Sequence, residues 1–447
     1  MLFLNNWDWI CETYLTEGKG GLIMLAGDWL QQWFYYIGAG PVIISLLLTT
    51  LGVIWFRISH GMLRFICKKC KWSQKVWVDG VAYAVAIVAV LAETSRVCTA
   101  EYPVGATLYV LMFSLLIMII KWPVRGIIRC VTFCLLLFIG VLSCPMPEQV
   151  INAKTWRQPD MLIEHQMALD VEASMGNWQK VEQLTKGKYE DYNTEIYYRN
   201  LCLAHRGQLA DSLLMRPQNA TEGLIIPVND KGNYFLFSAA GEVWWATQDL
   251  TMAEHASILG MIFSPRHTGS RNLRRLAEIS LAKGDMAAAD KYLRLLDQTL
   301  AHRRWAQTIR QQQQPIAQLA LDKPDTLRFS TETGLCLRTM LQARPSNEMA
   351  KQYLLCYDLL SKDLYSFAND IQQFGCPAGI RVYEEAMLII MASRPELRDE
   401  WQSLIREQTY REFVAFNEAI AQSQGQLKPL HQRFGKTYWF YFKANQQ

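Results

Sequence analysis

The chain has 447 residues, of which 51% are hydrophobic and 19% are charged, and its formal net charge is +4. So small a charge gives no electrostatic basis for nucleic-acid binding, and much of the positive excess lies in connectors between apolar segments. The mean hydropathy of zero averages two unlike parts, because residues 39–144 hold four apolar stretches and nothing comparable follows them. We therefore predict an all-α protein, with a multi-span transmembrane helical anchor followed by a soluble helical domain.

Residues 1–38 are predicted to form an extracytoplasmic or interfacial segment. Its start has neither the basic region nor the small-residue cleavage site of a secretory signal peptide, so translocation is expected to use the spans themselves. Within residues 21–37, Leu22, Leu25 and Trp29 fall on one helical face. This pattern is typical of a helix that lies in the membrane interface; the alternative is a simple extension of the first span.

Residues 39–144 are predicted to cross the membrane four times. The apolar stretches are 39–56, 76–92, 104–120 and 127–143. Basic residues such as Arg57, Arg64, Lys68 and Lys69 follow the first stretch, and the positive-inside rule places them in the cytoplasm. Both ends of the chain are then expected outside the cytoplasm. Asp79 and Arg129 are expected near an interface, and Glu93 in an outer loop.

Residues 145–158 are predicted to be a polar linker, and residues 159–447 a soluble tetratricopeptide-like helical repeat domain. The clearest unit is 272–300, in which two helical patterns flank a Gly284-Asp285 turn and the second carries small residues where helices would cross. Similar turns are expected at Gly176-Asn177, Gly207-Gln208, Gln248-Asp249 and Lys362-Asp363. The first four turns are 31, about 41 and about 35 residues apart, near the tetratricopeptide period of ~34.

The predicted repeats are degenerate and interrupted. Residues 224–237 are expected to form a loop or short hairpin, and residues 311–324 a polar connector. Helices are predicted over 381–392 and 396–423. The aromatic run at 437–442 is expected to pack against the end of the array, because the ends of a solenoid need caps.

Several short motifs together resemble an uncharacterised family of integral membrane proteins from Bacteroidota, a domain of unknown function. The matching positions are Gly20–Leu22, Phe34–Tyr36, Lys291–Leu293, Arg303–Ala306 and Tyr438–Phe442. The resemblance spans nearly the whole chain, but it brings no catalytic residue with it. It implies an integral protein of the bacterial inner membrane, and with the orientation expected from the basic residues the C-terminal domain is then periplasmic. It also implies one further span upstream of the first residue of this chain.

Sequence motifs for chemistry are sparse. Cys67 and Cys70 have redox or half-zinc-site spacing, but no second pair completes four ligands. Glu164-His165 and Glu254-His255 each place an acid beside a base, yet adjacent helical residues point ~100° apart. Disulfides are possible among Cys202, Cys336, Cys356 and Cys376 but cannot be assigned from the sequence. We predict no catalytic residue, no metal site and no cofactor.

One concentration of positive charge stands out in the soluble part. Its members are Arg266, His267, Arg271, Arg274, Arg275, Arg303 and Arg304. Stacked repeats would bring them together as a surface for an anionic partner, such as a phosphorylated glycan, a lipid headgroup or an acidic peptide. The alternative is a solvated face, because Glu278 lies three residues after Arg275 and four after Arg274.

The predicted function is that of a scaffold. The anchor would fix the chain in the lipid bilayer, and the repeat array would present a surface to a protein partner without any enzymatic activity of its own. The alternative is a membrane component of an enzyme or transport system of envelope glycan or lipid metabolism, with its site among the spans. No nucleic-acid partner is expected.

Overall fold

The computed structural model describes residues 21–35, 38–69, 77–97, 104–119, 161–187, 192–228, 232, 234–264, 269–299, 302–312 and 330–444. Within these ranges the regular elements are helices and no strand occurs, which confirms the all-α class. The chain divides into two compact units. One comprises Met1–Glu164, Thr268–Arg274 and Asp290–Gln314; the other comprises His165–His267, Arg275–Ala289 and Pro315–Gln447.

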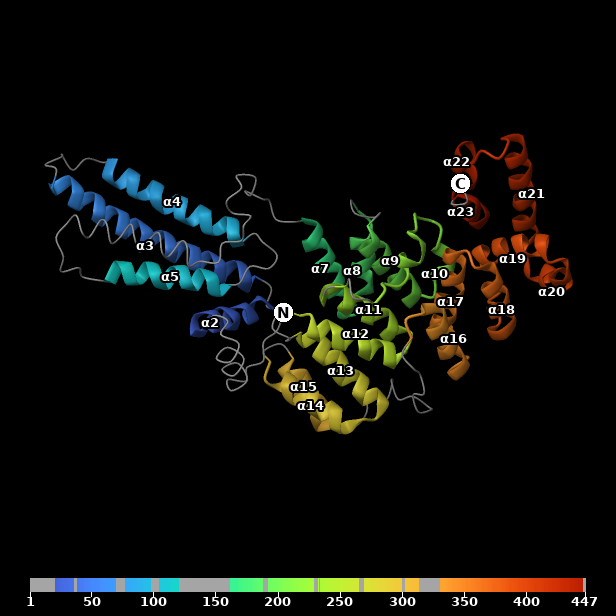
Figure 1. The fold of residues 1–447 in the computed structure, drawn as a ribbon, viewed down its shortest axis with the longest axis horizontal. Helices are drawn as coiled ribbons and strands as arrows, with labels where there is room; N and C mark the ends of the chain where they lie inside the picture. The colour runs from blue at the N-terminus through green and yellow to red at the C-terminus, as the bar shows by residue number, and fades with distance from the viewer. Residues whose placement is uncertain are drawn as a thin grey trace. The chain divides into compact units, whose positions relative to one another are not determined.

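The first unit begins with apolar helices (Figure 1). They are α2 (Gly21–Gln32), the short η1 (Trp33–Tyr35), α3 (Ala39–Lys69), α4 (Trp77–Val97) and α5 (Val104–Ile119). Helix α3 lies beside both α4 and α5, and α2 packs on α5. A break with Gly38 at φ +85° separates α2 from α3, so α2 is a helix of its own and not an extension of the first span.

Small residues let these helices approach closely. The buried face of α4 presents Val78, Ala82 and Ala86 at every fourth position, and a Cβ on Gly52 of α3 would meet the Val90 side chain at 3.1 Å. Small residues of this kind permit the backbones of two helices to come into close contact. A core of Leu51, Ile54 and Ile58 on α3 with Leu111 and Ile117 on α5 completes the packing.

The four predicted spans have different outcomes. Helices α3 and α4 are long and apolar enough to cross a membrane, and only 17% and 22% of their most apolar windows are buried. The third stretch is a shorter apolar helix, and the fourth, 127–143, lies outside the described residues. The prediction of an outer loop at Glu93 is wrong, because α4 continues to Val97 and buries Glu93 on its packed face. There the Thr107 hydroxyl of α5 donates to Glu93 Oε1 at 2.7 Å.

From Met161 onward the described chain is a succession of short helices (Figure 1). These are α7 (Met161–Ser174), α8 (Trp178–Leu184), α9 (Asn193–His205), α10 (Leu209–Ser212), η3 (Ala220–Gly223), α11 (Tyr234–Ala246), α12 (Leu250–Ile262), α13 (Ser270–Lys283), α14 (Met286–Asp297), α15 (Arg303–Gln312), α16 (Thr333–Ala343), α17 (Glu348–Ser361), α18 (Leu364–Phe374), α19 (Arg381–Ser393), η5 (Pro395–Leu397), α20 (Arg398–Trp401), η6 (Gln402–Leu404), α21 (Glu407–Gln422), η7 (Lys428–Leu430), α22 (His431–Phe434) and α23 (Tyr438–Ala444).

The five predicted hairpin turns are confirmed, and they share one backbone device. The second residue of each turn donates its N–H to the carbonyl five residues earlier, at 2.9 Å in all five cases. The residue before it has positive φ, a left-handed conformation that Gly284 adopts without strain and that Gln248 and Lys362 also adopt. In three turns an aspartate then caps the next helix: Asp249, Asp285 and Asp363 accept the N–H three residues on. The turn chemistry therefore repeats where the intervening sequence does not.

Two other predictions need correction. The stretch 224–237 is predicted to be a loop or short hairpin; residues 224–228 do form a loop, but α11 already begins at Tyr234. The predicted helix over 396–423 is broken into η5, α20 and η6 before α21 begins at Glu407. The helix predicted over 381–392 is confirmed as α19.

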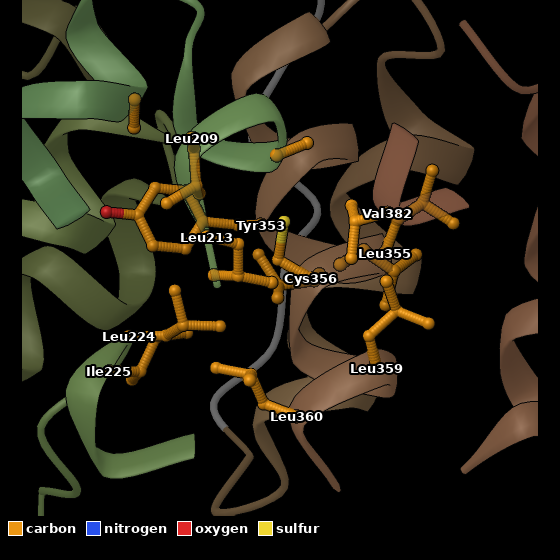
Figure 2. Packing of buried hydrophobic residues seen from close by; sticks show 14 of the residues in the cluster. Leu209, Leu213, Leu224, Ile225, Tyr353, Leu355, Cys356, Leu359, Leu360 and Val382 are labelled. Carbon is orange, nitrogen blue, oxygen red and sulfur yellow. The ribbon is translucent and has the colours of Figure 1, made fainter. Parts of the chain in front are cut away.

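One continuous apolar core runs through the second unit, from Leu169 on α7 to Phe440 on α23. Figure 2 shows the part of it where Leu209 and Leu213 meet Tyr353 and Cys356 of α17. The C-terminal aromatic run closes this core, as predicted. Tyr438 and Trp439 are buried, and the Tyr438 hydroxyl donates to the Leu359 carbonyl at 2.9 Å. Burial of such large rings stabilises the end of the array by several kcal/mol, on the order of 3 for each.

Candidate functional site

The predicted basic patch is only partly assembled. Arg266 and His267 lie outside the described residues. Arg275 turns inward, where its guanidinium donates to Glu242 at 2.9 Å and to Glu278 at 2.8 Å and lies 4.4 Å from the Trp245 ring centroid. The predicted pairing of Arg275 with Glu278 is thus confirmed, and Arg275 serves packing within the array.

Arg274, the neighbouring residue, has different surroundings. Its guanidinium carbon lies 4.8 Å from the centroid of the Trp305 ring on α15. Arg303 and Arg304, in the first turn of α15, are exposed, and Arg303 Nε donates to the Asp297 carbonyl at 3.0 Å. The structure therefore places the Arg274 side chain against α15. Burial, and then the nearby Arg274 charge, lower the pKa of His302 to about 4, so His302 adds no charge at neutral pH.

The structure adds basic residues that the sequence prediction left out. Lys291 and Arg294 on α14 and Arg310 on α15 are all exposed. Arg294 pairs with Asp290 in the preceding helical turn, and Arg310 Nε reaches the same carboxylate at 3.2 Å. The spacing of four between Asp290 and Arg294 was a visible signal for the first pair. The second joins residues twenty positions apart and requires the fold.

A buried carboxyl pair is a second cluster that the sequence did not indicate. Arg338 Nε on α16 donates to Asp370 at 2.9 and 3.1 Å, and its Nη2 donates to Asp358 Oδ1 at 3.0 Å. Both aspartates are buried. Burial first, and then the hydrogen bond and charge of Asp370, raise the pKa of Asp358 to about 9. Among the described residues nothing donates to Asp358 Oδ2, the position where a retained proton would sit.

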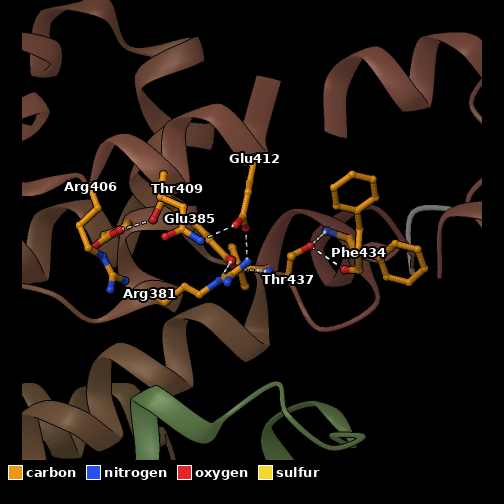
Figure 3. A network of polar contacts seen from close by, with 11 residues as sticks. Arg381, Glu385, Arg406, Thr409, Glu412, Phe434 and Thr437 are labelled. Atoms are coloured by element: carbon orange, nitrogen blue, oxygen red, sulfur yellow. Dashed lines mark hydrogen bonds and ion pairs between the residues drawn. The ribbon is translucent and has the colours of Figure 1, made fainter. Parts of the chain in front are cut away.

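Two adjacent glutamates on α19 form a third cluster (Figure 3). Glu384 accepts from Arg406 Nε at 2.7 Å and from the Thr409 hydroxyl at 2.5 Å. Glu385 accepts from Arg381 Nε at 2.7 Å and from the Tyr438 N–H at 2.6 Å. Burial raises the pKa of Glu385. These carboxylates tie α19 to α21 and α23 and have their oxygens occupied, which fits a structural role.

The predicted acid-base neighbours have separate partners. His165 Nε2 lies 2.9 Å from Glu195 Oε2, and Glu254 pairs with Lys283 at 2.7 Å. His165 and Glu254 thus each contact a residue of another helix. Cys202, Cys336, Cys356 and Cys376 are free thiols, and burial raises the pKa of Cys376 to about 11.

A small cavity lies against α19. This cavity, beside Cys376, Tyr383 and Glu384, offers about 10 Å³, room for roughly one water molecule. Groups of three or more histidine, cysteine or carboxylate residues that could hold a metal ion do not occur among the described residues. The clusters described above are ion pairs that join neighbouring helices, together with the exposed basic residues of α14 and α15.

Comparison with known proteins gives a family without an assigned activity. The family described as "Family of unknown function (DUF6057)" matches residues 1–144 and 127–445 of the chain. No curated protein and no solved structure matches it. The matched residues cover both the apolar helices and the helical array, so the chain belongs to the family of unknown function DUF6057.

Proposed function

We propose that the chain is a membrane-anchored scaffold, in which α3 and α4 cross the bacterial inner membrane and the helical array presents a periplasmic surface to a protein partner. The observation that carries this proposal is the repetition of one hairpin turn at five places around one continuous core. Stacked hairpins of this kind build extended surfaces, because each repeat packs mainly on its neighbours and exposes its outer edges.

The apolar helices support the anchoring half of the proposal. Leu46 on α3 and Ile87 and Val88 on α4 are exposed by 63%, 56% and 65%. A soluble protein rarely leaves so many large apolar side chains in contact with water, whereas in a bilayer the same side chains face lipid. The hydrogen-bonded helical backbone meets the other requirement of a membrane span.

Exposed aromatic residues on the array support the interaction half. Tyr365 on α18 is exposed by 64% and carries the Arg394 guanidinium 4.8 Å from its ring centroid. Tyr410 on α21 is also exposed. Tyrosine and arginine are the residue types enriched among those that contribute most to binding energy at protein interfaces.

Site-specific photocrosslinking in native membranes tests the interaction. A photoreactive residue would replace Tyr365, Tyr410 or Arg274 in the full chain, with Arg398 on the small helix α20 as the matched exposed control. We expect a discrete protein adduct from Tyr365 or Tyr410 and none from Arg398. Adducts of lipid or glycan alone, at every position, would contradict the scaffold and favour an enzymatic or transport role.

One observation favours that rival role. Glu93 is a carboxyl group buried among apolar helices, and ionisable residues inside a membrane often serve transport or catalysis. Its hydrogen bond from Thr107 also explains it as a link between α4 and α5. The Glu93→Gln variant distinguishes a helix link from a transport or catalytic site. If Glu93 only links α4 to α5, the variant should retain its crosslinks to the partner and still complement a strain that lacks the protein. If Glu93 serves transport or catalysis, the variant should fail to complement that strain.

A further inference from the structure

The hairpin of α14 and α15 carries an unbalanced positive charge. Its basic residues are Lys291, Arg294, Arg303, Arg304 and Arg310. Arg274 on α13 lies over the Trp305 ring of α15, and we term these six residues the basic surface. Two carboxylates, Asp290 and Asp297, lie in the same segment. Six positive against two negative side chains leave a surplus of four, equal to the net charge of the whole 447-residue chain.

The two carboxylates are already engaged. Asp290 accepts from Arg294 and Arg310, and its pKa is lowered first by the hydrogen bond from Arg294. Asp297 Oδ2 lies 3.7 Å from Arg310, and its Oδ1 accepts from Gln307 at 2.7 Å. These contacts compensate Arg294 and Arg310. Lys291 and Arg304 are exposed and make no ion pair with the described residues, so their charge is available to a ligand.

The basic surface also has an amphipathic helix at its centre. On α15, Ala306 is buried and Trp305 and Ile309 are half-buried, while Arg303, Arg304 and Arg310 are exposed. Trp305 lies under the Arg274 guanidinium. A short helix with arginines on its outer face and a tryptophan at its flank has the composition of elements that rest on a membrane surface.

The basic surface belongs to the same compact unit as the apolar helices. Residues 268–274 and 290–314 cluster with 1–164, apart from the rest of the helical array. If α3 and α4 lie in a bilayer, this surface is part of the unit that the bilayer holds. A lipid headgroup is then a more accessible anion than a diffusing acidic protein.

We propose that the basic surface binds anionic lipid headgroups of the membrane in which α3 and α4 are anchored. Arginine presents several N–H donors in a planar fork that matches phosphate oxygens, and Lys291 adds a point charge. Clusters of four to eight basic residues next to a membrane are sufficient to prefer anionic over zwitterionic lipid. This inference rests on the anchoring proposed above and assigns the anion that the surface takes.

Native mass spectrometry of the purified full chain in detergent tests the inference. The protein would be titrated with dioleoyl phosphatidylglycerol and, separately, with dioleoyl phosphatidylcholine. The test variant is Arg303→Gln with Arg304→Gln, which keeps good helix formers in α15. The matched control is Arg398→Gln with Arg411→Gln, two exposed arginines of α20 and α21 in the other unit.

The wild type is expected to bind phosphatidylglycerol more tightly than phosphatidylcholine. Each removed arginine should weaken that binding about fivefold, while the control pair leaves it unchanged. Equal binding of the two lipids, or a phosphatidylglycerol affinity that survives the Arg303 and Arg304 changes, would overturn the inference. A third titration uses polyglutamate. Binding of polyglutamate without binding of phosphatidylglycerol would overturn the lipid inference in favour of an acidic protein partner.

Failure of the anchoring itself has a separate readout. The same three proteins, the wild type and the two double variants, are expressed and their membranes are washed at alkaline pH. Retention of all three in the washed membrane, without any lipid preference in the titration, would reject the lipid site but not the membrane anchor. Release of the wild type by the wash would reject both.

Discussion

Arg338 holds Asp370 by two hydrogen bonds from its Nε, at 2.9 and 3.1 Å, and so fastens α16 to α18. The same guanidinium reaches Asp358 on α17, which brings two buried carboxyl groups to one cation. One positive charge cannot compensate two buried negative charges, so the fold keeps a proton on Asp358. The stability of the packing among α16, α17 and α18 is therefore linked to pH.

The Asp358→Asn variant tests that linkage. Unfolded Asp358 releases its proton near the ordinary pKa of 3.8, whereas the folded state retains it to about 9. Between these values the unfolded state binds fewer protons, so the contribution of Asp358 to the free energy of unfolding falls as pH rises. Asparagine mimics the protonated carboxyl and removes this loss. We expect the variant to match the wild type near pH 4 and to be more stable at pH 8, by several kcal/mol.

Thermal unfolding of the full chain in detergent, followed by tryptophan fluorescence between pH 4 and pH 8, measures this difference. Asp399→Asn on α20 is an exposed control that should change stability little at any pH. A constant difference between Asp358→Asn and the wild type across the range would show that Asp358 ionises normally in the folded state.

The hairpin turns predict two substitutions of opposite sign. Gly284 has φ +76°, so Gly284→Ala forces a Cβ into a left-handed residue and should cost about 1 kcal/mol. Gln248 already has φ +64°, and Gln248→Gly should stabilise by roughly 0.5–1 kcal/mol while keeping the backbone carbonyl that accepts from Arg344. Paired chemical unfolding curves measure both. Destabilisation by Gln248→Gly would mean that the contacts of the Gln248 side chain stabilise the fold by more than its left-handed backbone destabilises it.

The contact of α2 with α5 depends on two glycines. A Cβ on Gly27 would lie 2.1 Å from the Gly105 nitrogen, so alanine there must push the helices apart. We expect Gly27→Ala to lower the thermal unfolding temperature of the full chain in detergent. Gly80→Ala on α4 is the control, since a Cβ there has open space and alanine favours a helix by about 1 kcal/mol. Equal behaviour of the two variants would show that α2 does not pack on α5 through Gly27.

Local signals in the sequence predicted the parts of the fold that local chemistry determines. The turn at Gly284-Asp285 combines a left-handed residue with a helix cap, and the structure shows the same two roles at Lys362-Asp363 without any glycine. The pairing of Arg275 with Glu278 followed from helical spacing. The prediction for Glu93 failed because a charged residue near the end of an apolar run was taken for a loop, whereas Thr107 of another helix supplies its hydrogen bond.

The candidate sites were less predictable for the same physical reason. Arg338, Asp358 and Asp370 lie on three helices, 20 and 32 residues apart for the two pairs, and only tertiary packing brings them together. Arg274 and Arg275 are adjacent in sequence, yet one contacts Trp305 and the other contacts Trp245 and Glu242. A count of basic residues treats the two alike, whereas their contacts in the fold distinguish them.

The most direct test of the account is an alkaline wash of membranes that contain the full chain. It compares the wild type with a double variant, Leu46→Asp plus Ile87→Asp, which places charges on the exposed apolar faces of α3 and α4. The control is Met215→Asp, at an exposed position of the array. The account predicts that the wild type and Met215→Asp stay in the membrane and that the double variant is released, because a charge within a span costs roughly 3 kcal/mol. Release of the wild type, with the chain folded in solution, would contradict it.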